Sequence, residues 1–492
     1  MIHFVEKWIA KKPLIAFSSY YLLMCIVAIK GVGWLQADEH FRVLEPAHQI
    51  VYGYSTLPWE FNLHFPIVSW FLGLIYAVPL YFIKNFHLSG LTEASLLRCF
   101  TALICMTRLP AMWLIFRQLR PSGANISRWI LVYAFCPFVP MLFVRSNQEN
   151  WSATALIWAL LFALKSAQKA HYAIFSGIFI ALTFCFRFQV GFSAAGLGIY
   201  LLFNRPLKTT FFAVIGVFIG LLPMAITDFY AHGTPFLPAF NYLKYALGGE
   251  EDGKIWGTDS WTFYAGNYFS NWFPPYSPVL FLALIFGLMN SGILSSIVLP
   301  FVVVHFAIAH KEVRYFSPMV PFFILLMFVG WPKFEDWLSK YKFGKNSLIW
   351  HSKNVNILFF SAIFVAIFVG IQKQNDAPLM FSEVGQKLRL KTIDAQTMYV
   401  ADSRNQMSQF YFKNQNMELN KVSIAEMFSL LDSRRSERYT FAVYRINLAD
   451  FERLKSQCTV HFVSVSPIIM KAMTIFENIP RKKRVDTIVE CF

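Results

Sequence analysis

Long runs of apolar residues, separated by short polar loops, occupy the chain from about residue 14 to residue 372. Each run is near the length that a helix needs to cross a bilayer. The pattern therefore predicts an all-α polytopic membrane protein. The first run follows three lysines but lacks a small-residue cleavage site, so we expect a retained helix rather than a signal peptide. The runs lie near residues 14–34, 66–83, 94–116, 129–144, 151–164, 172–186, 188–203, 209–227, 277–289, 291–309, 316–331 and 356–372.

The positions of Lys and Arg indicate an orientation. If the run at 66–83 does not span, fifteen basic residues fall in loops on one side of the membrane. Basic loops stay on the cytoplasmic side, so this arrangement favours about eleven transmembrane helices. Residues 35–93 then form one external loop, whose segment 66–83 lies along or dips into the interface. The remaining polar clusters share the external face: Asp38–His40, Arg145–Asn150, Arg187, the loop 228–276, His310–Arg314 and the tail.

The tail, residues 373–492, is polar and mixed in charge. Its strand-like and helix-like runs predict a small external α/β domain that follows a transmembrane domain of residues 1–372. Cys458 and Cys491 would pair there if the domain faces an oxidising compartment, but two cysteines set no pattern, so their state stays open. The strand-like runs are Met398–Ala401, Thr440–Tyr444 and Thr459–Val465, and the helix-like runs are Ile424–Leu431, Ala449–Gln457 and Ile468–Phe476.

Composition supports the membrane assignment and removes one class of partner. The chain is 56% hydrophobic and only 15% charged, whereas a soluble chain carries about a quarter charged residues. The net charge of +16 would suggest nucleic acid in a soluble protein. Here the basic residues sit in short loops, where membrane orientation explains them, so we expect no nucleic acid. The histidines show no ligand spacing, and we predict neither a metal nor a cofactor.

Two charged motifs could carry chemistry. Asp38 and Glu39 follow the first apolar run, and a carboxylate there could take a proton from an acceptor hydroxyl. A solvated helix end is the alternative. His310, Lys311 and Arg314 follow a later run and suit a phosphate-like anion, with a snorkelling interfacial cluster as the alternative.

Other polar residues near helix ends have structural alternatives too. Arg187 stands alone between two apolar runs and should face the bundle interior, paired with an acid or with a substrate phosphate. Arg145 and Glu149 are four positions apart at a helix end, which favours a structural salt bridge between them. The loop 228–276 is rich in aromatic residues such as Trp256 and Trp261, which suit sugar binding or an interfacial belt.

These motifs, taken in series, resemble glycosyltransferase family 22. Asp38-Glu39-His40-Phe41 followed by Gly53–Phe61 is similar to its first luminal loop, where a His-Pro-Asp-Glu motif precedes Gly-Tyr-Gly…Thr-Trp-Glu-Trp. His310-Lys311-Glu312…Arg314-Tyr315 resembles its His-Lys-Glu…Arg-Phe motif most closely. Three further segments keep the family's order: Arg145–Glu149, Asn241–Tyr245 and Trp256–Tyr264.

The resemblance implies a GT-C fold and an inverting transfer of mannose from a polyprenyl (dolichyl) phosphate to a lipid-linked glycan or glycolipid. It implies Asp38 as general base, with Glu39 orienting the base or the acceptor. Arg187, His310, Lys311 and Arg314 would lie near the donor phosphate. Residues of the matching loops are then expected to contact the acceptor or the sugar: Glu60, Arg145, Glu149, Trp256, Asp259 and Trp261.

The chain also departs from the family pattern. Gln36-Ala37 stands where the family has His-Pro, and the tail does not match the cysteine- and histidine-containing end expected of eukaryotic members. We therefore favour a bacterial plasma membrane, with the endoplasmic reticulum as the alternative. A GT-C enzyme for another sugar is the first rival function. A lipid-linked-sugar flippase or transporter is the second, but no inverted repeat is visible and the charges gather at one face. The acceptor, the linkage, the oligomeric state and the role of the tail stay open.

Overall fold

The structure is a computed structural model that describes residues 2–34, 36–121, 125–136, 139–247, 257–271, 277–340, 363–364, 367–368, 371, 377–389, 397–401, 408–413, 418–433, 439–464 and 484–491. Its internal contacts define two compact units. The first contains Met1–Ile29, Trp59–Leu72 and Arg98–Ile371, and the second contains Lys30–Pro58, Gly73–Leu97 and Gln372–Phe492. Parts of the expected first external loop therefore pack with the tail, and the functional division at residue 372 stays a prediction.

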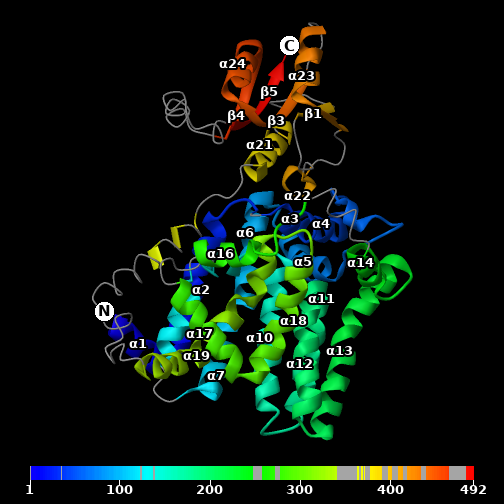
Figure 1. Cartoon of the computed structure of the whole chain (residues 1–492). Coiled ribbons are helices and arrows are strands. Elements are labelled where there is room, and N and C mark those ends of the chain that lie inside the picture. Colours follow the sequence, from blue (N-terminus) through cyan, green and yellow to red (C-terminus); the bar gives the residue numbers. More distant parts are fainter. Residues whose placement is uncertain are drawn as a thin grey trace. The chain divides into compact units, whose positions relative to one another are not determined.

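The described part of the first unit consists of helices and loops. Helix α11 packs against α10, α12 and α13, and α17 packs against α19, as Figure 1 shows for this unit. The elements are α1 (Ile2–Lys11), α2 (Pro13–Lys30), η1 (Trp59–Phe61), the second half of α6 (Gly90–Cys105), α7 (Arg108–Leu119), α8 (Ile126–Ala134), α9 (Val139–Phe143), α10 (Gln148–Lys165), α11 (Tyr172–Phe186), η2 (Phe188–Val190), α12 (Gly191–Asn204), α13 (Leu207–His232), α14 (Leu237–Leu247), α16 (Phe263–Asn271), α17 (Ser277–Asn290), α18 (Gly292–Ala307), η3 (Val313–Met319) and α19 (Val320–Lys340).

Four stretches of the described chain are long and apolar enough to cross a bilayer: Pro13–Lys30, Gly90–Leu119, Leu207–His232 and Val313–Lys340. Helices α17 and α18 meet at a bend of 116° and add a fifth if they form one broken span. Helix α11, the pair η2–α12, and α5 (Phe71–Lys84) are apolar but shorter. The chain is a multi-pass membrane protein, yet the described residues contain fewer long spans than the eleven expected, because several apolar runs fold as short helices. The run at 356–372 lies largely outside the described residues.

Glycines set the closest helix contacts in this unit. A methyl group added at Gly216 of α13 would overlap the carbonyl oxygen of Ile174 in α11. A methyl group at Gly330 of α19 would overlap the carbonyl oxygen of Ala283 in α17. Small residues let helix backbones touch, which supplies packing energy where the hydrophobic effect cannot.

The second unit combines short helices from the first loop with a five-stranded sheet from the tail. The strand order is β2-β1-β3-β5-β4, with β1 parallel to β2 and β3, and β5 antiparallel to β3 and β4. Phe441, Val443 and Val489 lie in its buried core together with Phe451 and Leu454 of α24. The elements are α3 (Ala37–Phe41), α4 (Leu44–Tyr52), α5, the first half of α6, α21 (Ala377–Arg389), β1 (Thr397–Ala401), α22 (Gln409–Phe412), β2 (Glu418–Val422), α23 (Ile424–Ser433), β3 (Tyr439–Asn447), α24 (Leu448–Gln457), β4 (Cys458–Val463) and β5 (Arg484–Cys491).

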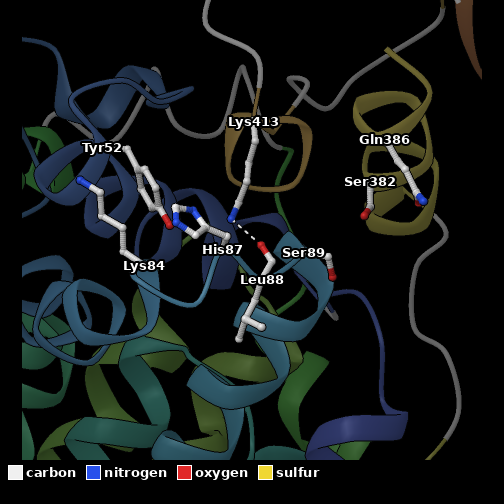
Figure 2. A pocket seen from close by; sticks show the side chains of 8 residues that line it. All are labelled: Tyr52, Lys84, His87, Leu88, Ser89, Ser382, Gln386 and Lys413. Carbon is white, nitrogen blue, oxygen red and sulfur yellow. Dashed lines mark hydrogen bonds between the residues drawn. The ribbon is translucent and has the colours of Figure 1, made fainter. Parts of the chain in front are cut away.

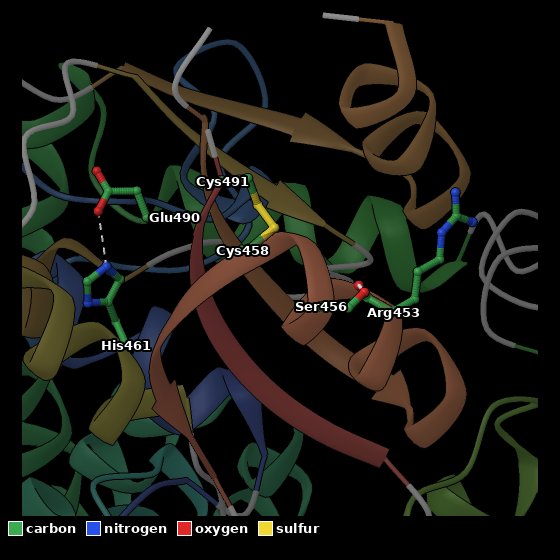
Figure 3. Close-up of a disulfide and its surroundings, with 6 residues drawn as sticks. All are labelled: Arg453, Ser456, Cys458, His461, Glu490 and Cys491. Carbon is green, nitrogen blue, oxygen red and sulfur yellow. Dashed lines mark hydrogen bonds and ion pairs between the residues drawn. A yellow bond between two sulfur atoms is a disulfide. The ribbon is translucent and has the colours of Figure 1, made fainter. Parts of the chain in front are cut away.

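A disulfide joins Cys458 to Cys491, which settles the state that the sequence left open. The two cysteines are direct partners in the antiparallel pairing of β4 with β5. Figure 3 shows the bond where the start of β4 lies beside the end of β5, with His461 of β4 pointing toward Glu490 of β5. Their side chains pair at 3.1 Å. A covalent bond therefore joins β4 to β5 in addition to their backbone hydrogen bonds.

The sheet confirms the predicted α/β character of the tail. The strands predicted at 398–401, 440–444 and 459–465 are β1, β3 and β4, and the helices predicted at 424–431 and 449–457 are α23 and α24. The helix-like run Ile468–Phe476 lies outside the described residues. Two strands were missed: β2 is a charged edge strand, and in β5 charged residues interrupt the apolar pattern that identifies a strand.

Candidate active site

Two adjacent acids of the second unit differ in exposure. Asp38 and Glu39 both lie on α3, a helix of five residues. The carboxylate of Asp38 is 27% exposed and pairs with Arg42 at 3.0 Å, one helical turn away. Glu39 is only 5% exposed. The more accessible acid is Asp38, so the geometry favours it over Glu39 as the group that meets an acceptor hydroxyl.

The next residue, His40, anchors the tail to the first loop within the same unit. His40 Nε2 lies 2.6 Å from Ser408 Oγ and 3.2 Å from Glu45 Oε1. The His40 ring stacks on Trp34 and on Tyr411, with centroids 4.8 and 5.0 Å away. Serine, histidine and glutamate meet here, but both partners share one ring nitrogen. A nucleophilic relay needs one partner on each nitrogen, so this cluster is an anchor.

Glu45 completes the anchor by binding backbone from both segments. Its carboxylate accepts the N–H of Thr56 at 3.0 Å and that of Phe410 at 3.2 Å. Burial raises the pKa of Glu45, but the hydrogen bond and charge of His40 outweigh burial, so that the pKa lies below its ordinary value. Burial also lowers the pKa of His48 to about 4, and its neutral ring donates from Nδ1 to the Tyr54 carbonyl at 2.7 Å. Glu45 is therefore charged, and His48 is uncharged, at neutral pH.

A cationic cluster in the first unit forms around Arg187. Arg187 follows α11 in an extended conformation and is 9% exposed. Its guanidinium lies 3.4 Å from the Glu149 carboxylate and donates to Gln148 Oε1 at 3.0 Å. It also lies 5.5 Å from the ring centroid of Tyr315. The sequence left an acid or a substrate phosphate open as the partner of this cation, and in the fold Arg187 pairs with the acid Glu149.

Tyr315 connects Arg187 to the segment 310–315. The Arg314 guanidinium also lies 5.5 Å from the Tyr315 ring centroid. Glu312 organises the segment: its carboxylate pairs with Arg314 at 2.7 Å, accepts the Tyr315 hydroxyl at 3.0 Å and lies 3.5 Å from His310. The structure thus brings Arg187, Arg314 and His310 into one cluster with Glu149 and Glu312.

Lys311 behaves differently from its neighbours. It is 5% exposed, and its ammonium donates to the backbone carbonyls of Asp259 and Ile308. The backbone N–H of Lys311 donates to the Asp259 carboxylate at 3.3 Å. The backbone N–H of Asp259 donates to the Ala309 carbonyl at 3.0 Å, so the two segments are clamped together. Gly257, with a positive φ of 84°, precedes this clamp. The geometry favours a role in positioning the loop over a direct contact with phosphate.

The other predicted site residues are scattered. Glu60 is 6% exposed in η1, Arg145 is 1% exposed before α10, and Trp261 is 71% exposed. Trp256 lies outside the described residues. Asp38 and Glu39 belong to the second unit, and the other described candidates belong to the first.

Asp228 is one of the buried acids that sequence reasoning did not single out. Asp228, near the end of α13, is fully buried and accepts a hydrogen bond from Ser69 at 2.5 Å. Its position at the end of an apolar run was the available signal. As for metal binding, no group of three or more His, Cys, Asp or Glu side chains in the described ranges could hold an ion.

The profile of the Alg9-like mannosyltransferase family matches residues 13–415, which is most of the chain. The chain belongs to the Alg9-like mannosyltransferase family. The match extends across both carboxylates of α3 and the whole cationic cluster. It also reaches Ser408 and Phe410 of the anchor, so the family region ends within the tail.

Relatives in the Alg9-like family are distant in sequence. The chain is 27% identical over 258 residues to alpha-1,2-mannosyltransferase alg9 of Schizosaccharomyces pombe, a match that covers 47% of this chain and 41% of that protein. It is 24% identical over 380 residues to human GPI alpha-1,2-mannosyltransferase 3, covering 73% of this chain and 63% of the relative. The matches thus span less than two thirds of the length of these relatives.

A solved structure supports the fold expected for this Alg9-like chain. ArnT from Cupriavidus metallidurans, bound to undecaprenyl phosphate, superposes with a TM-score of 0.55 over 98% of both chains at 11% identity. At so low an identity, the superposition shows only that the two folds are similar. The mostly helical membrane protein with a small mixed sheet in its tail therefore resembles the GT-C fold of ArnT.

Proposed function

We propose that this chain transfers mannose from a polyprenyl phosphate donor to a lipid-linked glycan or glycolipid at the external membrane face. The observation that carries the proposal is the cluster in which two guanidiniums, from Arg187 and Arg314, lie equally close to the Tyr315 ring. Such cations suit a departing lipid phosphate, since guanidinium binds phosphate oxygens in a bidentate manner. Family membership supports mannose, and the ligand of ArnT supports a polyprenyl phosphate.

In the proposed reaction, Asp38 takes the proton of an acceptor hydroxyl as its oxygen attacks C1 of mannose. The bond between C1 and the phosphate oxygen breaks with inversion, and the lipid phosphate leaves with the bonding electrons. Arg187 and Arg314 stabilise that anion, with His310 beside them and Lys311 and Asp259 positioning the loop. Arg42 holds the Asp38 carboxylate in place by its ion pair. Glu39, Glu60, Arg145, Trp256 and Trp261 stay candidates for binding acceptor or sugar.

The proposed topology has eleven crossings, with the acids, the cationic cluster and the tail outside. The disulfide supports an external tail, because disulfides persist in oxidising compartments. It fits the space beyond a bacterial plasma membrane, which we favour, as well as the lumen of the endoplasmic reticulum. A reporter fused near residue 88 that reads cytoplasmic would contradict this topology.

The test uses the purified full chain in nanodiscs with labelled polyprenyl phosphate mannose and extracted lipids, with and without a chelator. We expect chelator-resistant labelling of a lipid that is lost in Asp38→Asn. A general base contributes about a hundredfold to ten-thousandfold in rate. Asp432→Asn is the matched control, because it neutralises an aspartate that is 60% exposed in the tail.

Each other outcome selects a different function. Turnover by Asp38→Asn at the wild-type rate refutes the base. Labelling with another lipid-phosphate sugar and none with mannose identifies a different GT-C transferase. If no donor in a panel labels a lipid, the result favours a transporter.

A further inference from the structure

A cavity of about 710 Å³ opens within the second unit, where the end of α5, the start of α6 and helix α21 meet Lys413. Its volume lies within the range of small-molecule sites, about 300–1,000 Å³. None of its lining residues belongs to the candidate active site. Figure 2 shows Lys413 and His87 directed toward Tyr52, with Ser382 and Gln386 presented by α21.

The cavity is lined by two lysines that share one aromatic ring. The ammonium groups of Lys84 and Lys413 lie 5.1 and 5.3 Å from the ring centroid of Tyr52. Lys413 is neutralised by the buried Glu93 at 2.6 Å and also donates to the Leu88 carbonyl. Lys84 donates to the Val51 carbonyl at 3.0 Å and has no carboxylate partner among the described residues. The described lining therefore keeps an uncompensated positive charge at Lys84.

Neutral polar groups also line the cavity, on the opposite side of the view in Figure 2 from Lys84. Ser89 at the start of α6, and Ser382 and Gln386 on α21, contribute hydroxyl and amide groups to the lining. A cation selects an anion, whereas hydroxyl and amide groups match the hydroxyls of a sugar. The aromatic ring of Tyr52 adds an apolar face to the lining. Together these groups suit a saccharide that carries a phosphate.

We propose that this cavity binds the phosphate-bearing carbohydrate headgroup of the lipid acceptor, with Lys84 as its main anion contact. That the ligand is the acceptor rests on the proposed function, whereas the binding of a phosphate-bearing sugar does not. A phospholipid headgroup of the bilayer is the other source of the same phosphate. The cavity is formed by both the first loop and the tail, which gives the tail a role in recognising the acceptor.

The binding test follows mannose 6-phosphate by saturation-transfer NMR on the full chain in phosphatidylcholine nanodiscs. Lys84→Gln is expected to weaken binding about tenfold, the effect of one charge-assisted hydrogen bond. Lys84→Arg should retain it. Lys455→Gln is the matched control, since Lys455 is 58% exposed on α24 and pairs with Glu452. Equal affinity of wild type and Lys84→Gln overturns the proposal.

A second variant protects the test against misfolding. Ser382→Ala removes one lining hydroxyl without changing charge, and we expect a weaker loss of about threefold for one neutral hydrogen bond. If the wild type and Ser382→Ala, which both keep Lys84, bind mannose as well as they bind mannose 6-phosphate, the cavity does not select phosphate and the proposal fails.

Two further arms identify the source of the phosphate. Phosphatidylglycerol in the nanodiscs should leave the affinity for mannose 6-phosphate unchanged. Displacement of mannose 6-phosphate by this lipid would assign the cavity to a membrane lipid and overturn the proposal that it binds the acceptor. In the transfer assay, Lys84→Gln should raise KM for the acceptor about tenfold and leave kcat and the donor KM unchanged, again the effect of one charge-assisted hydrogen bond. If the wild type transfers no mannose, the proposed function fails while the NMR result still decides the cavity.

Discussion

The guanidinium of Arg187 lies 3.4 Å from the carboxylate of Glu149, and both side chains are less than a tenth exposed. A buried pair of this kind gains little net stability, because desolvation offsets the attraction between the charges. Removing one partner is costly, since the other is left buried and uncompensated. Glu149 therefore holds the Arg187 side chain in place.

The first prediction separates structure from function at this pair. Arg187→Gln should destabilise the protein by about 3–5 kcal/mol and abolish transfer. The double variant Arg187→Met with Glu149→Leu should recover stability, because neither charge remains, while transfer stays absent. Thermal unfolding in detergent and the labelling assay provide the two readouts. A double variant that transfers mannose at the wild-type rate would limit Arg187 to a structural role.

The second prediction concerns Lys311. Because its ammonium is bound by backbone carbonyls, Lys311→Ala should loosen the loop at 257–262 rather than remove a phosphate contact. We expect hydrogen exchange in that loop to accelerate about tenfold or more, since the clamp holds it against local opening. Arg314→Ala should lower transfer without this change. Unaltered exchange in Lys311→Ala, together with a raised donor KM, would restore Lys311 as a phosphate ligand.

The third prediction is a loss of stability in acid. The pKa of His48 is about 4 in the fold, below its ordinary value of 6.5. Between these values the unfolded chain binds a proton that the folded chain does not, so stability falls as pH drops from 6.5 to 4. The full loss is about 3 kcal/mol. The lowered pKa of Glu45 acts in the same direction, because its stabilising charge is lost as pH falls.

The measurement is hydrogen exchange at residues 44–54 and 408–413 between pH 7.5 and 4.5, corrected for the intrinsic rate. His48→Gln should flatten the acid response, and His461→Gln, a change in the sheet, should not. An unchanged slope in His48→Gln would exclude this histidine as the source.

The fourth prediction concerns the disulfide. The loop between Cys458 and Cys491 spans 33 positions, so reduction should cost the sheet about 3–4 kcal/mol through the entropy of the unfolded chain. We expect faster proteolysis of the tail in the variant with both cysteines changed to serine. Cys25→Ser, at a free cysteine of α2, is the control. Equal proteolysis rates in the two variants would show that the disulfide does not stabilise the tail.

The fifth prediction concerns helix packing. Gly330→Ala should lower the folded yield strongly, because the new methyl group overlaps the backbone of Ala283 and Gly287. Gly198→Ala in α12 should be neutral or stabilising by up to about 1 kcal/mol, since nothing lies within 4 Å of its added methyl group. Fluorescence-detected gel filtration compares the two yields, and equal yields would contradict the packing argument.

The sequence by itself determined the class of this protein. Long apolar runs identify a membrane bundle because a helix satisfies its backbone hydrogen bonds within its own segment, as lipid requires. The ordered motifs from Asp38 to Tyr315 predicted the family, which the profile match confirms. Strands β1, β3 and β4 were also predicted, since their β-branched and aromatic residues are typical of strands.

Only the tertiary structure decided which charges meet. Glu149 is one residue from Gln148 and 38 positions from Arg187, and nothing local selects its partner. Ser408 and His40 lie 368 positions apart in the chain, so their hydrogen bond follows from how the tail folds onto the first loop. Lys311 resembles a phosphate ligand in the sequence, but in the fold its ammonium is buried and donates to two backbone carbonyls. Local sequence specifies elements and motifs, whereas the pairing of distant side chains depends on packing that no short segment contains.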